Sequence, residues 1–131
     1  MIGLDTNILV RYLTQDDPAQ SRRATEIIER QLSEEKPGFV SIVAMVETVW
    51  VLDRAYNLVA REIARAVERL LQTDVLVLEN EQDVFTAMIA LKEGKGEFAD
   101  AVIAALGIRA NCSHTLTFDH KAARLRGFEP A

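Results

Sequence analysis

The strongest constraint on the fold is the alternation of short apolar runs with longer stretches of helical spacing. Strands are predicted at 1–4, 39–40, 75–78 and 115–118, with the first read as buried and the last as a core strand. Helices are predicted between them at 8–13, 18–32, 42–52, 60–71, 81–91 and 98–108, with a short terminal helix opened by Asp119. The order βααβααβααβα predicts an α/β protein with a parallel sheet and helices on its faces, because parallel strands need long crossovers.

Length and composition restrict the class of protein further. A chain of 131 residues fits one domain spanning 1–131. A single cysteine, no zinc-type spacing and no apolar run of ~18–20 residues favour a cytoplasmic protein without a membrane span. The net charge of −5 argues against a general nucleic-acid coat protein. The sequence still allows a local basic rim, formed by Arg11, Arg22, Arg23, Lys92, Lys95, Lys121, Arg124 and Arg126.

Four acids stand apart from the other carboxylates of the chain. Asp5, Glu47 and Asp100 are each the only charge in a core-like segment, and Asp119 directly follows a predicted strand. A carboxylate in an apolar setting costs several kcal/mol unless it is paired, protonated or bound to a cation. None of the three core-like segments contains a lysine or arginine. Several acids brought together would suit a hard divalent cation with oxygen ligands.

Structural roles for these acids remain open at this point. Asp5 and Asp119 stand where a helix N-cap would stand, and Asp100 lies where it would complement a helix dipole. Glu47 falls in the middle of a helix, where a buried hydrogen bond or a salt bridge would account for it. Asn7 and Thr117 are predicted to orient carboxylates or a metal-bound water, or else only to shape their turns.

Other reactive or aromatic side chains are assigned to structure. His114 and His120 have no partner at metal-ligand spacing, and Cys112 has no neighbouring base, so nucleophilic catalysis finds no support. The aromatic residues on apolar faces are predicted to be core rather than base-stacking platforms: Phe39, Trp50, Phe85 and Phe98.

The chain as a whole resembles the PIN-domain nucleases, and within them the VapC-type toxins of toxin–antitoxin pairs. The matching pieces are Leu-Asp-Thr-Asn-Ile-Leu at 4–9, Ser41 with Glu47, Phe-Ala-Asp-Ala at 98–101 and Thr-Phe-Asp at 117–119. The resemblance implies a three-layer α/β/α fold with a short parallel sheet of four to five strands. It also implies a Mg²⁺- or Mn²⁺-dependent endoribonuclease, a homodimer and a small inhibitory antitoxin.

The same resemblance implies roles for the four acids. Asp5 and Asp100 correspond to direct metal ligands, Glu47 to a ligand or water-orienting acid, and Asp119 to the fourth member. Three alternatives are weighed against this one: a catalytically silent interaction module, a PIN nuclease of RNA processing that is not a toxin, and a phosphatase of the haloacid-dehalogenase type. The last calls for Asp-x-Asp, whereas this chain has Asp5-Thr6-Asn7. The sequence does not specify which RNA is cleaved.

Overall fold

The computed structural model describes all residues from Met1 to Ala131 and divides them into two compact units. Unit 1 comprises Met1–Glu81 and unit 2 comprises Gln82–Ala131. The expectation of one domain over 1–131 stays a prediction. None of the helices has the length and apolar character needed to cross a bilayer.

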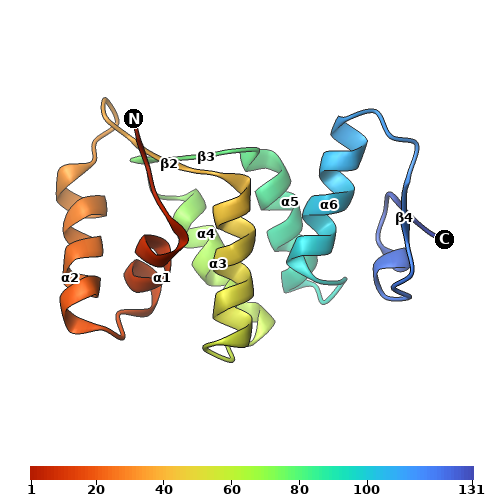
Figure 1. Ribbon diagram of the computed structural model, residues 1–131, viewed down its shortest axis with the longest axis horizontal. Helices are drawn as coiled ribbons and strands as arrows, with labels where there is room; N and C mark the ends of the chain where they lie inside the picture. The colour runs from red at the N-terminus through yellow and green to blue at the C-terminus, as the bar shows by residue number, and fades with distance from the viewer. The chain divides into compact units, whose positions relative to one another are not determined.

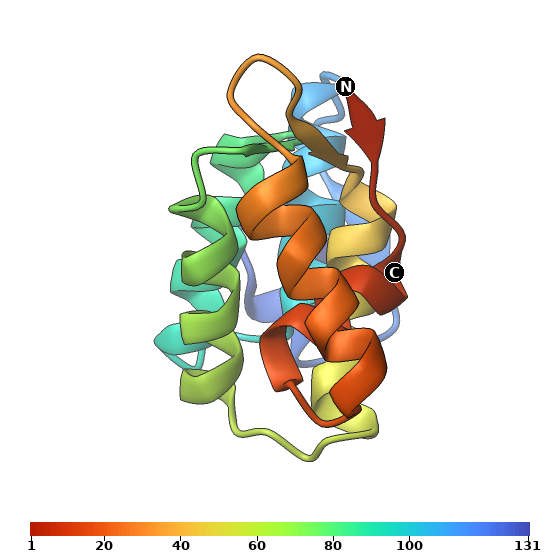
Figure 2. The ribbon, with the colours of Figure 1, turned by 90° about the vertical axis from the view of Figure 1, so that its left-hand side faces the viewer.

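Unit 1 contains a parallel three-stranded sheet with strand order β1-β2-β3. In the register, Ile2 pairs with Gly38, and Gly38 pairs in turn with Leu76. The elements in chain order are β1 (Ile2–Gly3), α1 (Thr6–Thr14), α2 (Pro18–Glu26), a π-helical turn (Ile27–Gln31), β2 (Gly38–Val40), α3 (Ile42–Arg54), α4 (Ala60–Leu71) and β3 (Leu76–Leu78). In Figures 1 and 2, α1 and α2 lie side by side and α3 packs against α1.

Local sequence signals fix the starts of these helices. Ser41 caps α3 by accepting the backbone N–H of Ala44 at 3.1 Å. Asp17 caps α2, and Pro18 occupies the first helical position, where its missing N–H costs nothing. The middle strand needs a glycine at Gly38, because a Cβ there would come within 2.7 Å of a methyl group of Leu32.

Unit 2 consists of two helices followed by a parallel strand pair. Its elements are α5 (Glu81–Lys92, from Gln82 onward), α6 (Phe98–Arg109), β4 (Thr115–Thr117), a 3₁₀ turn (Ala122–Arg124) and β5 (Phe128–Pro130). Thr115 pairs with Phe128 and Thr117 with Pro130. A small core joins Ala104, Ala122 and Phe128, with Leu125 partly buried against it.

The predicted fold class is confirmed, since the protein is α/β, every strand pair is parallel and six α-helices accompany the strands. Five details of the prediction are wrong. The strands form one sheet of three and one of two, not a single sheet of four to five strands. The strand β5 was not predicted, and the terminal helix is only a 3₁₀ turn. The helix expected over 18–32 changes to a π-helical turn at Ile27. The first and last predicted strands are not buried, because β1 is exposed and Leu116 in β4 is 61% exposed.

The aromatic residues divide between core and surface. Phe98 is fully buried, as predicted. Trp50 and Phe85 are 57% and 45% exposed, so their assignment to the core is wrong, and Phe39 is half-buried. Helix α3 is apolar over much of its circumference, so its sequence alone does not tell which apolar side faces the interior.

Candidate metal centre

Unit 1 holds two of the four predicted acids through one threonine. Asp5 follows β1 and is the N-cap of α1, where its Oδ1 accepts the backbone N–H of Thr6 at 2.7 Å. The buried hydroxyl of Thr6 donates a hydrogen bond to Oε1 of Glu47, in the middle of α3. Thr6 therefore binds both carboxylates, one through its backbone and one through its side chain.

The carboxyl ends of the three strands in unit 1 carry polar side chains at one edge of the sheet. Asp5 follows β1, Ser41 follows β2 and Glu79 follows β3. The Glu79 carboxylate accepts the backbone N–H of Ile42 at 2.8 Å and so satisfies a free donor at the start of α3. This edge is where open parallel α/β sheets bind their ligands.

Unit 2 holds the other two acids without such a link. Asp100 lies in the first turn of α6 and is partly exposed. Partial burial raises the pKa of Asp100, and the negative charges of Glu97 and Asp119 raise it further. Asp119 follows β4, and its Oδ1 accepts the backbone N–H groups of Lys121 at 2.8 Å and Ala122 at 3.3 Å.

None of the four acids is paired with a cation of the protein. The ion pairs of the chain involve other carboxylates, and Asp5, Glu47, Asp100 and Asp119 take part in none of them. No three His, Cys, Asp or Glu side chains lie close enough to hold a metal ion together. Asp5 and Glu47 belong to unit 1 and Asp100 and Asp119 to unit 2. Carboxylate oxygens are the donor set that Mg²⁺ and Mn²⁺ take.

Two of the four acids are more exposed in the structure than their sequence segments predict. The desolvation cost expected for Asp5, Glu47 and Asp100 is wrong for Asp5 and Glu47, which are exposed, whereas Asp100 is partly buried. Asp119 is exposed as well. The N-cap interpretation is confirmed for Asp5 at α1. The N-cap of the 3₁₀ turn is Lys121 and not Asp119, although Oδ1 of Asp119 accepts the backbone N–H groups of Lys121 and Ala122. The absence of a cationic partner does not separate the four from other acids, since Glu79 and Glu97 also take part in no ion pair. The four are set apart by their positions in the sequence.

The two residues predicted to orient the site make other contacts or none. Thr117 Oγ1 accepts the backbone N–H of Asp119 at 3.0 Å and so shapes the turn. Asn7 is exposed and its side chain makes no hydrogen bond within the chain. Sequence reasoning missed Thr6 and Glu97. The signals were present, because Thr6 is the polar residue next to Asp5 and Glu97 precedes Asp100 by three positions, one helical turn.

The remaining candidates contribute little to the site. His114 contacts Ser113 at 3.0 Å and lies 3.7 Å from Glu129, and Cys112 is exposed. Within the expected basic rim, three members form ion pairs with nearby acids: Arg11, Arg23 and Lys95.

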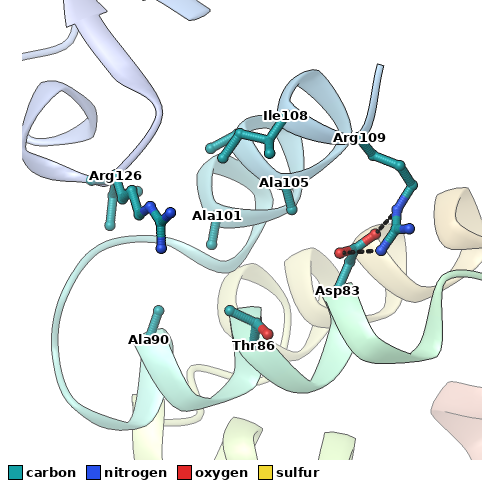
Figure 3. Close-up of a pocket in the computed structure, with 10 residues that line it drawn as sticks. Asp83, Thr86, Ala90, Ala101, Ala105, Ile108, Arg109 and Arg126 are labelled. Carbon is teal, nitrogen blue, oxygen red and sulfur yellow. Dashed lines mark hydrogen bonds and ion pairs between the residues drawn. The ribbon is translucent and has the colours of Figure 1, made fainter. Parts of the chain in front are cut away.

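Unit 2 also contains a pocket of about 430 Å³ between α5 and α6. In Figure 3, small side chains line it from both helices, Ala90 from α5 and Ala101 and Ala105 from α6. Arg126 lies at one end and the Arg109–Asp83 ion pair at the other. Arg109 binds Asp83 through two hydrogen bonds of 2.8 and 2.9 Å. None of the four acids lines this pocket, which is therefore separate from the candidate centre.

The structure is that of a parallel α/β protein in which Asp5 and Asp119 follow strands, Asp100 lies in the first turn of a helix and Glu47 lies in the middle of one. The chain belongs to the PIN domain family, whose model matches residues 2–127. PIN domains are generally nucleases that use divalent metals and act on RNA. A comparison with curated proteins found no match.

Proposed function

We propose that this protein is a divalent-metal-dependent endoribonuclease in which Asp5, Glu47, Asp100 and Asp119 hold the cation. The observation that carries the proposal is that Thr6 binds two of these carboxylates, Asp5 through its backbone N–H and Glu47 through its hydroxyl. In unit 2, partial burial and the negative charges of Glu97 and Asp119 raise the pKa of Asp100. Membership of the PIN family supports a nuclease. The joint use of acids from both units rests on the sequence pattern and the family, together with the geometry inside each unit.

The four acids have different roles in the proposed site. Asp5 and Asp100 would be the direct ligands of Mg²⁺ or Mn²⁺, and Glu47 and Asp119 would complete the set or orient water. A divalent cation bound there would polarise the phosphate and lower the pKa of the attacking water. Thr6 holds the Glu47 carboxylate, and the backbone of the following turn holds Asp119. Hydrolysis adds one water across a P–O bond and leaves a phosphate monoester and a hydroxyl.

The decisive experiment compares RNA cleavage by the wild type with cleavage by Asp5→Asn and Asp100→Asn. We expect both substitutions to abolish Mn²⁺-dependent cleavage of a single-stranded RNA while the circular dichroism spectrum stays that of the wild type, because only a charge is removed. Asp53→Asn is the matched control, since Asp53 is exposed and pairs only weakly with Arg54 at 3.6 Å. Undiminished cleavage in both variants, or cleavage that persists in excess EDTA, would falsify the proposal.

We further propose that the chain acts as one domain in the cytoplasm, as a homodimer and as the VapC-type toxin of a toxin–antitoxin pair. These points rest on the resemblance of the motifs at Asp5, Glu47, Asp100 and Asp119. A toxin should arrest growth when expressed alone, and the arrest should be relieved by a small protein encoded beside it. Normal growth with active enzyme in the cell would instead indicate an RNA-processing nuclease.

A further inference from the structure

The outward side of α3 carries an exposed tryptophan close to one of the proposed site residues. Val43, Glu47, Trp50 and Arg54 follow one another at spacings of four, three and four residues, so they lie along one side of the helix. Val43 is 73% exposed, Trp50 is 57% exposed and the Arg54 side chain is more than half exposed. The guanidinium carbon of Arg54 lies 5.9 Å from the centre of the Trp50 ring.

Leaving this ring in solvent forgoes stabilisation. Burial of a large aromatic side chain stabilises a fold, and Trp50 is the only tryptophan of the chain. Its neighbours along the helix are charged: Glu47 one turn before it, and the exposed Asp53–Arg54 pair just after it. The centre of a stable protein interface is depleted in charge and covers about 800 Å² on each partner. Val43 and the partly buried Val46 are apolar on this side, but Glu47, Asp53 and Arg54 interrupt it with charge, so its composition does not fit a second copy of the chain.

An exposed aromatic ring beside an arginine has the chemistry that binds unpaired nucleotides. Proteins recognise single-stranded RNA by stacking bases on aromatic side chains and arginine planes, and a basic group contacts the adjacent phosphate. The Asp53–Arg54 pair has a distance of 3.6 Å and both side chains are more than half exposed, so it holds the guanidinium only weakly. Arg54 is therefore available to a phosphate group.

We propose that Trp50, assisted by Arg54, is a stacking platform for one unpaired base of the RNA substrate. The inference rests on the proposed ribonuclease function and adds a substrate requirement to it. Trp50 follows Glu47 by three residues, a rise of about 4.5 Å along the helix. The stacked base therefore belongs to a nucleotide next to or near the scissile phosphate. The substrate must be single-stranded at that point, because a base inside a duplex cannot reach the ring.

Tryptophan fluorescence reports directly on contact between Trp50 and RNA, because Trp50 is the only tryptophan in the chain. The probe is an unstructured eight-nucleotide uridine RNA carrying a 5′ dye, added to the Asp100→Asn variant in EDTA so that it is not cleaved. We expect saturable quenching of tryptophan fluorescence by the unlabelled RNA. In anisotropy titrations with the dye, Trp50→Ala should weaken binding about 5- to 150-fold, the range for one stacked base. Trp50→Phe should retain most of the affinity.

Phe85→Ala is the matched control, because Phe85 is an exposed aromatic residue on a different helix and should leave RNA affinity unchanged. Absence of quenching, or equal RNA affinity of Trp50→Ala and its parent, overturns the platform. The platform is also overturned if Trp50→Ala alters the oligomeric mass in light scattering but not RNA affinity, since α3 would then be an interface between copies. Cleavage with unchanged KM in Trp50→Ala overturns the platform and leaves the ribonuclease proposal intact. If the RNA quenches Trp50 fluorescence but the wild type shows no metal-dependent cleavage, only the ribonuclease proposal is contradicted.

Discussion

The two units differ in how they hold their acids. In unit 1, Thr6 donates its backbone N–H to Asp5 and its hydroxyl to Glu47, so each carboxylate has a donor. In unit 2, Asp119 accepts two backbone N–H groups, but Asp100 has no donor, and Glu97 and Asp119 add negative charge around it. Unit 1 therefore positions both acids with hydrogen bonds, whereas unit 2 leaves Asp100 under a repulsion that a cation would relieve.

This difference suggests a division of labour in the proposed site. A hydrogen-bonded carboxylate is oriented before any ligand arrives, and such orientation typically contributes 10- to 100-fold in metal affinity or activity. A bound divalent cation stabilises the ionised form of a carboxylate, and this stabilisation is greatest where the ionised form is otherwise disfavoured. Unit 1 would thus contribute geometry, and unit 2 the electrostatic attraction for the metal.

The largest effect should come from breaking the threonine link in unit 1. Thr6→Val keeps the shape of the side chain but removes the hydroxyl that binds Glu47, so we expect RNA cleavage and Mn²⁺ affinity to fall about 10- to 100-fold. Thr6→Ser should restore both, because it supplies the hydroxyl again. The measurement is a Mn²⁺ titration of the cleavage rate, with melting curves to confirm folding. Equal rates in Thr6→Val and the wild type would show that unit 1 does not depend on this bond.

A smaller effect should follow from removing the repulsion in unit 2. Because the pKa of Asp100 is raised, its ionised form opposes folding at neutral pH, and this penalty disappears when the group is protonated. In EDTA at pH 7, Asp100→Asn should therefore raise Tm slightly, whereas Glu47→Gln should not, because it replaces the hydrogen-bonded carboxylate of unit 1. Added Mn²⁺ should raise Tm of the wild type but not of Asp100→Asn. A lower Tm of Asp100→Asn in EDTA would contradict the repulsion.

The smallest effect concerns Asp16, a carboxylate of unit 1 whose pKa is lowered, whereas the pKa of Asp100 is raised. Hydrogen bonds from Tyr56 at 2.6 Å and Thr14 at 2.8 Å, together with Arg11, lower the pKa of Asp16 to about 2 from its ordinary 3.8. The lowered pKa stabilises the fold above about pH 3.8, and this contribution is lost as pH falls through about 2. Asp16→Asn should lower Tm modestly at pH 5 and converge with the wild type near pH 2. A difference independent of pH would rule out charge as its cause.

Much of the fold was predictable because its signals are local. The N-caps at Asp5 and Ser41, the proline at the start of α2 and the helical spacing of α4 specify their elements over a few residues. The strand β5 was missed because Phe128–Pro130 is only three residues long and ends in proline, and its strand character comes from pairing with β4. Exposure was predicted least well, since the outward side of α3 also carries apolar residues, Val43 and Trp50, beside its charged ones.

By itself the sequence determined the α/β order, the parallel pairing and the four acids as candidates, because period, capping and isolated charge are properties of the chain. Only the tertiary structure decided how the acids are held. Thr6 meets Glu47 across 41 positions, and Asp119 adds its charge to that of Asp100 from another element. Contacts between distant positions depend on how helices and strands pack, and no local pattern encodes the partner that packing supplies.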